Sequence, residues 1–245
     1  MNYGSEKTNP NRPIPSSESM KRVGAATKKA FISAGDFLTE AISNALFDRG
    51  FTITPETTVL DWGCGVGRVA FPLSQRFKMK LYGCDVDQTA IDFINKKNAG
   101  FSAFKSEYEP PLLFKDNFFD MVYAFSVFTH LPADAEKVWL KELYRITRPG
   151  ALLLLSVIGK KSLEIHHARD TDKHVSWDDV EKKGMVFAPN PAHKKDPKRW
   201  PGVTGDYGVT AHHPNYIYTT WGEYFTKIEI IEAGAGGQDI VVCTR

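Results

Sequence analysis

The 245-residue sequence has few cysteines, only short apolar runs and no marked excess of charge of either sign. Its three cysteines, Cys64, Cys84 and Cys243, are scattered and form no CxxC pair, which argues against a disulfide framework and a zinc site of that type. The apolar run 151–155 has five residues, whereas a membrane-crossing helix needs about 20. The formal net charge of +2 does not indicate a strongly basic surface for nucleic acid.

The N-terminus also lacks the apolar segment of a secretory signal. Together with the unpaired cysteines, this predicts a cytoplasmic protein with no membrane partner. Residues 1–19 are polar, contain prolines and have too few apolar side chains to offset the entropy lost on ordering, which favours a flexible arm. The alternative is a lid that becomes ordered over a ligand.

What the sequence does contain is a regular alternation of apolar segments, within a globular composition of 42% hydrophobic and 24% charged residues. Apolar residues at helical spacing begin at residue 34 and end before Gly50, and further helices are expected up to residue 77, over 88–97 with Asp87 as its cap, and over 133–147. Strands are expected at 57–62, 80–85, 101–106, 118–125 and 151–158. Continuously apolar strands alternating with helices predict an α/β fold with a parallel sheet.

Residues 160–215 interrupt this alternation and contain six of the seven histidines. A connection of this length is usually either functional or disordered. Two apolar segments, 227–233 and 239–244, then predict a closing β-hairpin. We therefore expect a flexible arm (1–19), a core (20–160), an insert that acts as a substrate lid (161–215) and C-terminal strands that complete the core sheet (216–245).

Three glycines, Gly63, Gly65 and Gly67, lie where the first expected strand passes into a helix. Glycine lets the backbone turn tightly there and lets a ligand approach closely. The spacing G-x-G-x-G differs from the G-x-G-x-x-G of dinucleotide-binding folds. Asp61, just before the loop, would repel a pyrophosphate and suits a ligand with an ammonium group, whereas Asp85, at the end of the second strand, can accept hydrogen bonds from a ribose diol.

The segments VLDWGCGVGR and LYGCDVD resemble the class I S-adenosylmethionine (SAM)-dependent methyltransferases. The resemblance continues in PPLLFKDNFFDMVYAFSVFTHLP and ELYRITRPGALLLLSV, so that it covers about residues 55–160 in the expected order. One departure is Gly150-Ala151, where this family usually has a glycine pair. The resemblance implies SAM as the cofactor and a Rossmann-like, doubly wound sheet of seven strands, mostly parallel, with an antiparallel C-terminal hairpin strand.

The resemblance also implies a set of cofactor-binding residues. Asp61 and the loop 63–67 would hold the amino-acid end of SAM, and Asp85 would bind the ribose. Residues after the second and third strands would lie beside the adenine, and residues after the fourth would face the methionine. The full expected set is Asp61, Trp62, Gly63, Cys64, Gly65, Gly67, Arg68, Asp85, Val86, Ser106, Glu107, Phe125 and Ser126.

Three histidines are candidate general bases: His130 in the segment FTHLP, and His166 and His167 in the insert. A base is needed only if the acceptor must lose a proton when it is methylated. A structural, hydrogen-bonded role is the alternative for His130. The histidine pairs fit no compact ligand motif, so that no metal is expected. Cys64 and Cys84 are expected to be small buried side chains rather than nucleophiles.

The acceptor is inferred mainly from missing motifs. The position after the fourth strand reads AFSVF rather than the N/D-P-P-Y/F of DNA and glutamine amino-methylating enzymes, and the sequence has no Pro-Cys pair of cytosine-C5 enzymes. The nearly neutral charge argues against nucleic acid. We expect O- or N-methylation of a small molecule, sugar or lipid, with two alternatives: a catalytically inactive binding or scaffold protein of the same fold, and a nicotinamide-dependent dehydrogenase.

Overall fold

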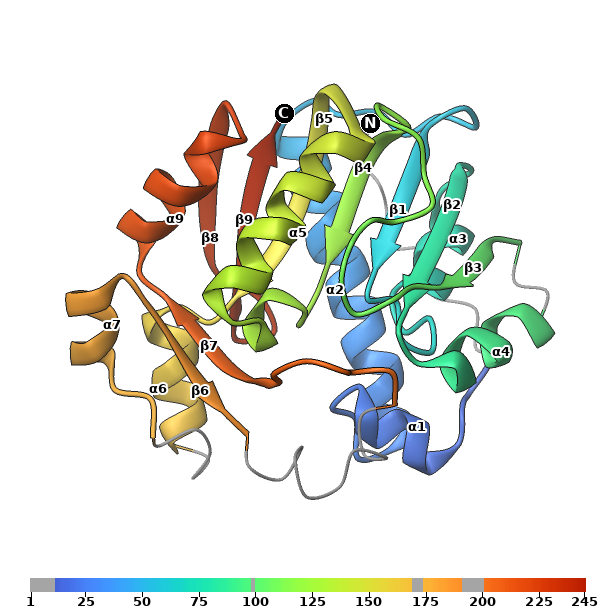
Figure 1. Cartoon of the computed structure of the whole chain (residues 1–245). Coiled ribbons are helices and arrows are strands. Elements are labelled where there is room, and N and C mark those ends of the chain that lie inside the picture. Colours follow the sequence, from blue (N-terminus) through green and yellow to red (C-terminus); the bar gives the residue numbers. More distant parts are fainter. Residues whose placement is uncertain (1–11, 98–99, 169–173, 191–200) are drawn as a thin grey trace.

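The computed structural model describes residues 12–97, 100–168, 174–190 and 201–245. Its centre is a seven-stranded sheet of order β3-β2-β1-β4-β5-β9-β8, in which the first five strands are parallel and β9 is antiparallel to both β5 and β8 (Figure 1). The strands are β1 (Thr58–Trp62), β2 (Lys80–Asp85), β3 (Ser102–Lys105), β4 (Phe119–Ala124), β5 (Thr147–Val157), β8 (Lys227–Ala235) and β9 (Gln238–Thr244). This confirms the predicted α/β, Rossmann-like sheet of mostly parallel strands with an antiparallel C-terminal hairpin.

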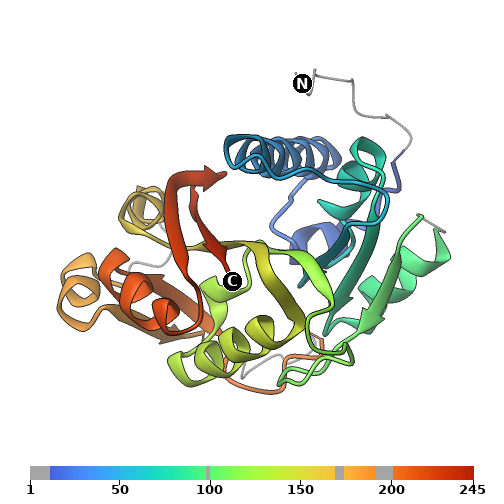
Figure 2. The same cartoon turned by 90° about the horizontal axis from the view of Figure 1, so that it is seen from above.

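Helices cover both faces of this sheet (Figure 2). On one face, α2 (Lys28–Asp48) and α3 (Ala70–Arg76) pack through residues such as Ile42 and Leu73 against Val59 of β1. On the other, α5 (Ala133–Ile146) and α9 (Pro214–Thr220) pack against Leu60. Because neighbouring strand residues point to opposite faces, strands buried on both sides must be apolar throughout, as the sequence indicates. Helix α4 (Gln88–Lys96) follows β2.

The N-terminal segment differs from the predicted arm. Ser16 caps a short helix, α1 (Ser17–Arg22), and Met20 of this helix is buried against Val66 of the glycine loop and Ala90 of α4. Arg12 is buried too and forms an ion pair with Asp36 of α2. The described part of the segment thus packs on the core, while residues 1–11 of the predicted arm lie outside the described residues.

The insert forms a small subdomain of its own. It contains α6 (Lys160–Ala168), α7 (Trp177–Lys183) and an antiparallel pair of strands, β6 (Met185–Pro189) and β7 (Gly208–His212). Buried Glu136 of α5 attaches it to the core, since one carboxylate oxygen lies 2.6 Å from Nε2 of His212 in β7. The other oxygen accepts a 2.9 Å hydrogen bond from Nε1 of Trp221, which follows α9 in the C-terminal segment. Throughout the described parts of the chain, no helix is long and apolar enough to cross a membrane.

Candidate active site

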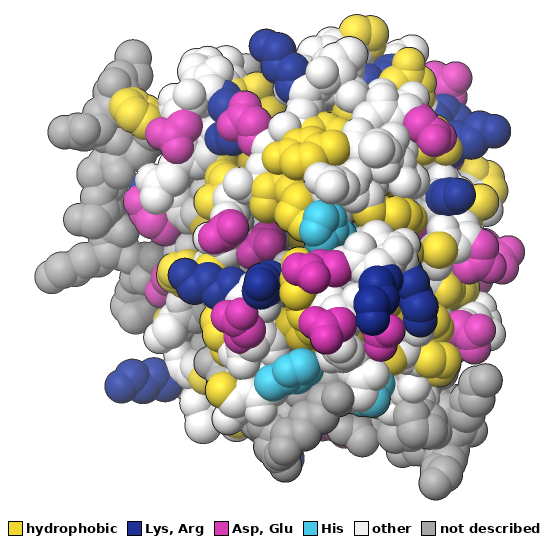
Figure 3. Space-filling view, turned by 90° about the vertical axis from the view of Figure 1, so that its left-hand side faces the viewer, with side chains coloured by type: hydrophobic (Ala, Val, Ile, Leu, Met, Phe, Trp, Pro, Cys, Tyr) yellow, Lys and Arg dark blue, Asp and Glu magenta, His cyan; other side chains and the backbone are white. Residues whose placement is uncertain are grey.

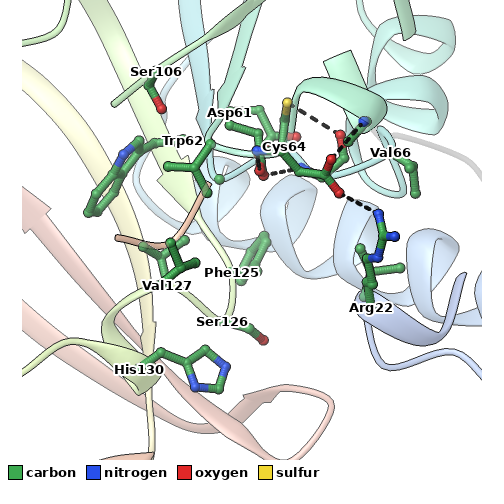
Figure 4. Close-up of a pocket in the computed structure, with 18 of the residues that line it drawn as sticks. Arg22, Asp61, Trp62, Cys64, Val66, Ser106, Phe125, Ser126, Val127 and His130 are labelled. Atoms are coloured by element: carbon green, nitrogen blue, oxygen red, sulfur yellow. Dashed lines mark hydrogen bonds and ion pairs between the residues drawn. The ribbon is translucent and has the colours of Figure 1, made fainter. Parts of the chain in front are cut away.

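A cavity of about 410 Å³ lies at the carboxyl ends of β1, β2 and β4 (Figure 4). The strand order reverses between β1 and β4, and the crevice at such a switch point is where open α/β sheets bind ligands. The volume falls within the range of about 300–1,000 Å³ for small-molecule sites. Every predicted cofactor-binding residue except Gly67 lines this cavity.

The glycine loop after β1 has a backbone that only glycine adopts readily. Gly63 has φ +75° and Gly65 has φ +50°, both in the left-handed region. A Cβ on Gly65 would lie 2.9 Å from a methyl group of Val23, and one on Gly63 would lie 2.4 Å from a methyl group of Val127. Gly67 instead serves packing, because a Cβ there would lie 2.7 Å from the Phe71 ring of α3.

Asp85 holds this loop in place. Its Oδ2 accepts a 2.7 Å hydrogen bond from the Gly65 amide, and its Oδ1 accepts a 2.8 Å bond from the Asp87 amide. Each carboxylate oxygen has a second lone pair, so that both oxygens can still accept a ligand hydroxyl. Burial raises the pKa of Asp85, although the backbone amides act in the opposite direction. Asp87 caps α4, as predicted, by accepting from the amides of Thr89 and Ala90.

Asp61 is a buried acid at the floor of the cavity. The Tyr123 hydroxyl donates a 2.9 Å hydrogen bond to its Oδ2, yet burial raises the pKa of Asp61 to about 8. Arg68 also lines the cavity and donates a 2.6 Å hydrogen bond to the Val23 carbonyl, and burial lowers its pKa. A cationic ligand group beside Asp61 would stabilise the carboxylate form.

Two segments outside the predicted set of cofactor-binding residues complete its walls. Ser19, Lys21, Arg22 and Val23, in and just after α1, line the cavity. Arg22 Nη1 lies 2.9 Å from Asp87 Oδ2, which ties α1 to the start of α4. The sequence signal for the packing of α1 on the core is the pair of apolar residues Met20 and Val23 in an otherwise polar segment.

The second such segment is residues 201–208, at the end of the insert. Pro201, Val203 and Tyr207 line the cavity. The Tyr108 hydroxyl donates a 2.5 Å hydrogen bond to the Asp206 carbonyl. Gly202 lies so close to Val86 that a Cβ on it would be 2.0 Å from the Val86 carbonyl oxygen. This segment therefore crosses the side of the cavity on which the adenine was expected.

His130 is the candidate base that the structure brings to the cavity. It ends a short 3-10 turn, Phe128–His130, and its Nδ1 lies 2.7 Å from the Gly208 carbonyl, so that Nδ1 carries the proton and Nε2 the lone pair of the neutral ring. Its ring stacks on Tyr207 at 4.5 Å. His166 and His167 lie on α6, outside the cavity lining, and His167 Nε2 is 3.0 Å from the Val175 carbonyl.

The cysteines near the loop are small buried side chains. Cys64, Cys84 and Cys243 are all free and buried, and burial raises the pKa of each thiol. Thiol groups of this kind stay protonated at neutral pH and make poor nucleophiles. Among the residues that the structure describes, no group of three or more His, Cys, Asp or Glu side chains is arranged to bind a metal ion.

Comparison with known proteins agrees with this geometry. A family model described as a methyltransferase domain matches residues 59–150. The chain is 34% identical over 118 residues to a 2-methyl-6-phytyl-1,4-hydroquinone methyltransferase of Synechocystis, a match covering 43% of this chain and 33% of the relative. It is 30% identical over 105 residues to a tRNA N(3)-methylcytidine methyltransferase of Schizosaccharomyces pombe, covering 40% and 42%. The matches thus span less than half the length of these relatives.

A solved structure extends the agreement in fold to almost the whole chain. The magnesium protoporphyrin IX methyltransferase ChlM of Synechocystis, determined with bound S-adenosylhomocysteine (SAH), superimposes with a TM-score of 0.57, 18% identity and coverage of 93% of each chain. Together these matches confirm the predicted resemblance to class I SAM-dependent methyltransferases. The family match covers residues 59–150, which include Asp61, the glycine loop and Asp85.

Proposed function

We propose that this protein is a SAM-dependent methyltransferase that methylates an oxygen or nitrogen atom of a small-molecule, sugar or lipid acceptor. The observation that carries the proposal is the arrangement of Asp61, the glycine loop and Asp85 around one cavity at the switch point of the sheet. The matched methyltransferase domain contains all three, and it supports this function over the nicotinamide-dependent alternative.

The residues present fit this cofactor. Gly65 lines the cavity without a side chain, and a Cβ there would lie 2.9 Å from a Val23 methyl group on the facing wall, so that glycine leaves the gap between loop and wall for the methionine part of the cofactor. Buried Asp61 suits its ammonium group, and the second lone pairs of the Asp85 oxygens suit the ribose hydroxyls. Val86, Ser106 and Glu107 would border the adenine. When bound, SAM supplies a methyl group already activated on a positively charged sulfur.

The protein's own contribution is to enclose the reactants and to accept a proton. Helix α1 and residues 201–208 cover the cavity from two sides, which would keep water from the reaction and hold the acceptor in line. His130 Nε2 is the nitrogen able to take a proton from a hydroxyl acceptor. An amine acceptor that enters in its neutral form would need no such base during attack.

A small acceptor is supported by this enclosure and by the surface charge. On the face in Figure 3, which includes α6, α7 and α9, the basic and acidic side chains of the described residues are interspersed rather than grouped by sign. A tRNA acceptor is the second candidate, because three relatives carry a tRNA methyltransferase activity in their names. A catalytically inactive binding protein of the same fold is a further alternative, and the cytoplasmic location is a prediction from the sequence.

Calorimetry with SAM, SAH and NAD tests the cofactor first. We expect a binding heat with SAM and with SAH, and no heat with NAD. Formation of SAH is then measured with panels of small amines and alcohols, with sugars, with dispersed lipids and with bulk tRNA. Turnover on tRNA alone would refute the small-acceptor proposal, and binding without turnover on any panel member would favour the inactive alternative.

A further inference from the structure

Ser126, directly after β4, has an unusual backbone for a residue with a side chain. Its φ is +61°, in the left-handed region, and it lines the cavity. Such a conformation is unfavourable for a residue with a Cβ and persists only where the surroundings enforce it. What enforces it here is a set of hydrogen bonds to two side chains from other strands of the sheet.

The two partners are Ser156 of β5 and Gln238, the first residue of β9. The Ser126 amide donates a 2.7 Å hydrogen bond to Ser156 Oγ. Ser156 Oγ lies 2.8 Å from Gln238 Oε1, and Ser126 Oγ lies 3.1 Å from the same oxygen. Ser156 is fully buried. Strands β4, β5 and β9 are neighbours in the sheet, so that the network joins three adjacent elements.

The donors and acceptors in this network leave one arrangement of protons. A carbonyl oxygen only accepts, so both serine hydroxyls donate to Gln238 Oε1. The proton of Ser126 Oγ is thereby committed, and the oxygen retains only lone pairs. Within the described ranges, no other group hydrogen-bonds to Ser126 Oγ. A ligand in the cavity can therefore donate a hydrogen bond to the Ser126 hydroxyl, but it can accept one from this hydroxyl only if the network breaks.

We propose that Ser156 and Gln238 are positioning residues that hold the Ser126 hydroxyl as a hydrogen-bond acceptor for the group to be methylated. The acceptor class that matches is one whose reacting atom carries a hydrogen, namely an amine N–H or a hydroxyl O–H, rather than a carbon centre or a tertiary amine. This inference rests on the proposed function and on the expectation that residues after the fourth strand, Ser126 among them, face the methionine part of SAM.

The probe pair SAH and sinefungin tests the inference without knowledge of the acceptor. Sinefungin carries an ammonium-bearing carbon where SAM has its methylated sulfur, so that it presents N–H donors at the reaction centre, whereas SAH presents none. Calorimetry should show that wild-type protein binds sinefungin about 10- to 100-fold more tightly than SAH. This ratio of affinities is the effect of one hydrogen bond that involves a charged group.

Two variants separate positioning from general structure. Ser126→Gly removes the hydroxyl and suits the positive φ, so that the preference should fall to about onefold to threefold with the SAH affinity almost unchanged. Gln238→Met removes the proton acceptor at similar side-chain length and should lower the preference at least about threefold. Ser106→Ala, on the adenine side of the cavity, is the control and should change both affinities equally.

Three outcomes are distinguishable. The inference is supported if Ser126→Gly and Gln238→Met lose the preference for sinefungin while Ser106→Ala keeps the wild-type ratio of sinefungin affinity to SAH affinity. Equal weakening of both ligands in these variants, or no preference in wild type, overturns it while the proposed function stands. If wild-type protein binds neither SAM nor SAH, the proposed function fails. If Gln238→Met does not fold, Ser126→Gly decides, because its backbone is compatible with the substitution.

Discussion

The two sides of the cavity are built in different ways. The floor comes from consecutive strand–turn–helix units between residues 59 and 130, whereas the walls come from α1 and residues 201–208, far away in the chain. Asp87 meets Arg22 across 65 positions, and Tyr108 meets Asp206 across 98. The floor residues lie close together in the sequence, so the spacing of their motifs is enough to predict their positions. The wall residues lie far apart in the sequence, so their positions depend on the whole fold. Substitutions in the two parts should therefore differ in how strongly they affect cofactor binding.

The largest effect is expected at the floor. Gly65→Val places a branched side chain at φ +50° in the space that the cofactor would enter. Affinity for SAH should fall by at least about 100-fold, an effect that calorimetry resolves. Gly100→Val is the matched control, since Gly100 has φ +76° and open space around its Cβ position. This control should show a similar loss of stability from backbone strain with unchanged SAH affinity, and equal binding losses in both variants would contradict the loop assignment.

Asp85→Ala should have the next largest effect, because it removes the predicted ribose partner and the partner of the Gly65 amide together. We expect SAH affinity to fall about 10- to 100-fold for each ribose hydroxyl that Asp85 binds, since one charge-assisted bond contributes about 1.5–3 kcal/mol. The melting temperature of the ligand-free protein should fall too, because the Gly65 and Asp87 amides lose their acceptor. Asp85→Asn, which retains one carbonyl oxygen, should give an intermediate affinity. Thermal melting without ligand and calorimetry with SAH check both effects, and normal affinity in Asp85→Ala would remove the ribose assignment.

The pH dependence of binding sharpens the role of Asp61. Its pKa of about 8 means that the free protein holds a proton there at neutral pH. Pairing with the ammonium of the cofactor requires release of that proton, so the affinity should rise by up to about tenfold per pH unit and level off near pH 8. Calorimetry in buffers of different ionisation enthalpy measures the proton released on binding. A pH-independent affinity between pH 6 and 8 would show that Asp61 does not pair with the ligand.

The same carboxyl group links stability to pH. Because the pKa of Asp61 is raised from 3.8 in the unfolded chain to about 8, its neutral form stabilises the folded protein at low pH, and this contribution is lost as pH rises through about 8. Asp61→Asn should abolish this part of the pH dependence. At pH 9 it should raise the melting temperature of the ligand-free protein by about 2–4 °C for each kcal/mol gained, while it weakens cofactor binding.

The same division explains how much of the site could be predicted. Asp61, the glycine loop and Asp85 lie at fixed distances from strand ends, so that spacing alone places them correctly around the cavity. The contribution of α1 was not assigned because the burial of Met20 depends on Val66 and Ala90, which only the fold brings near. The histidine-rich insert suggested bases, but its helix α6 contacts β8 and β9 at the far edge of the sheet. The insert residues that do line the cavity, Pro201, Val203 and Tyr207, belong to no sequence motif.

The smallest effect is expected at the wall formed by residues 201–208, where Tyr108→Phe removes only the hydroxyl that donates to the Asp206 carbonyl. The aromatic ring, which packs closely on Gly205, is retained, so that the change tests the hydrogen bond and not the packing. One neutral hydrogen bond contributes about 0.5–1.5 kcal/mol, which corresponds to about a two- to tenfold loss of SAH affinity if this bond helps to close the cavity.

Kinetics distinguish this wall from the floor. A residue that closes the cavity after ligand entry should act mainly on the dissociation rate, because the ligand must wait for the wall to open before it leaves. Stopped-flow displacement of SAH should therefore show about two- to tenfold faster dissociation in Tyr108→Phe, with little change in association. Tyr218→Phe, at an exposed position on α9, is the control and should match wild type. Slower association with unchanged dissociation would mean that residues 201–208 guide entry rather than close the site, and the floor alone would then determine how long the cofactor stays bound.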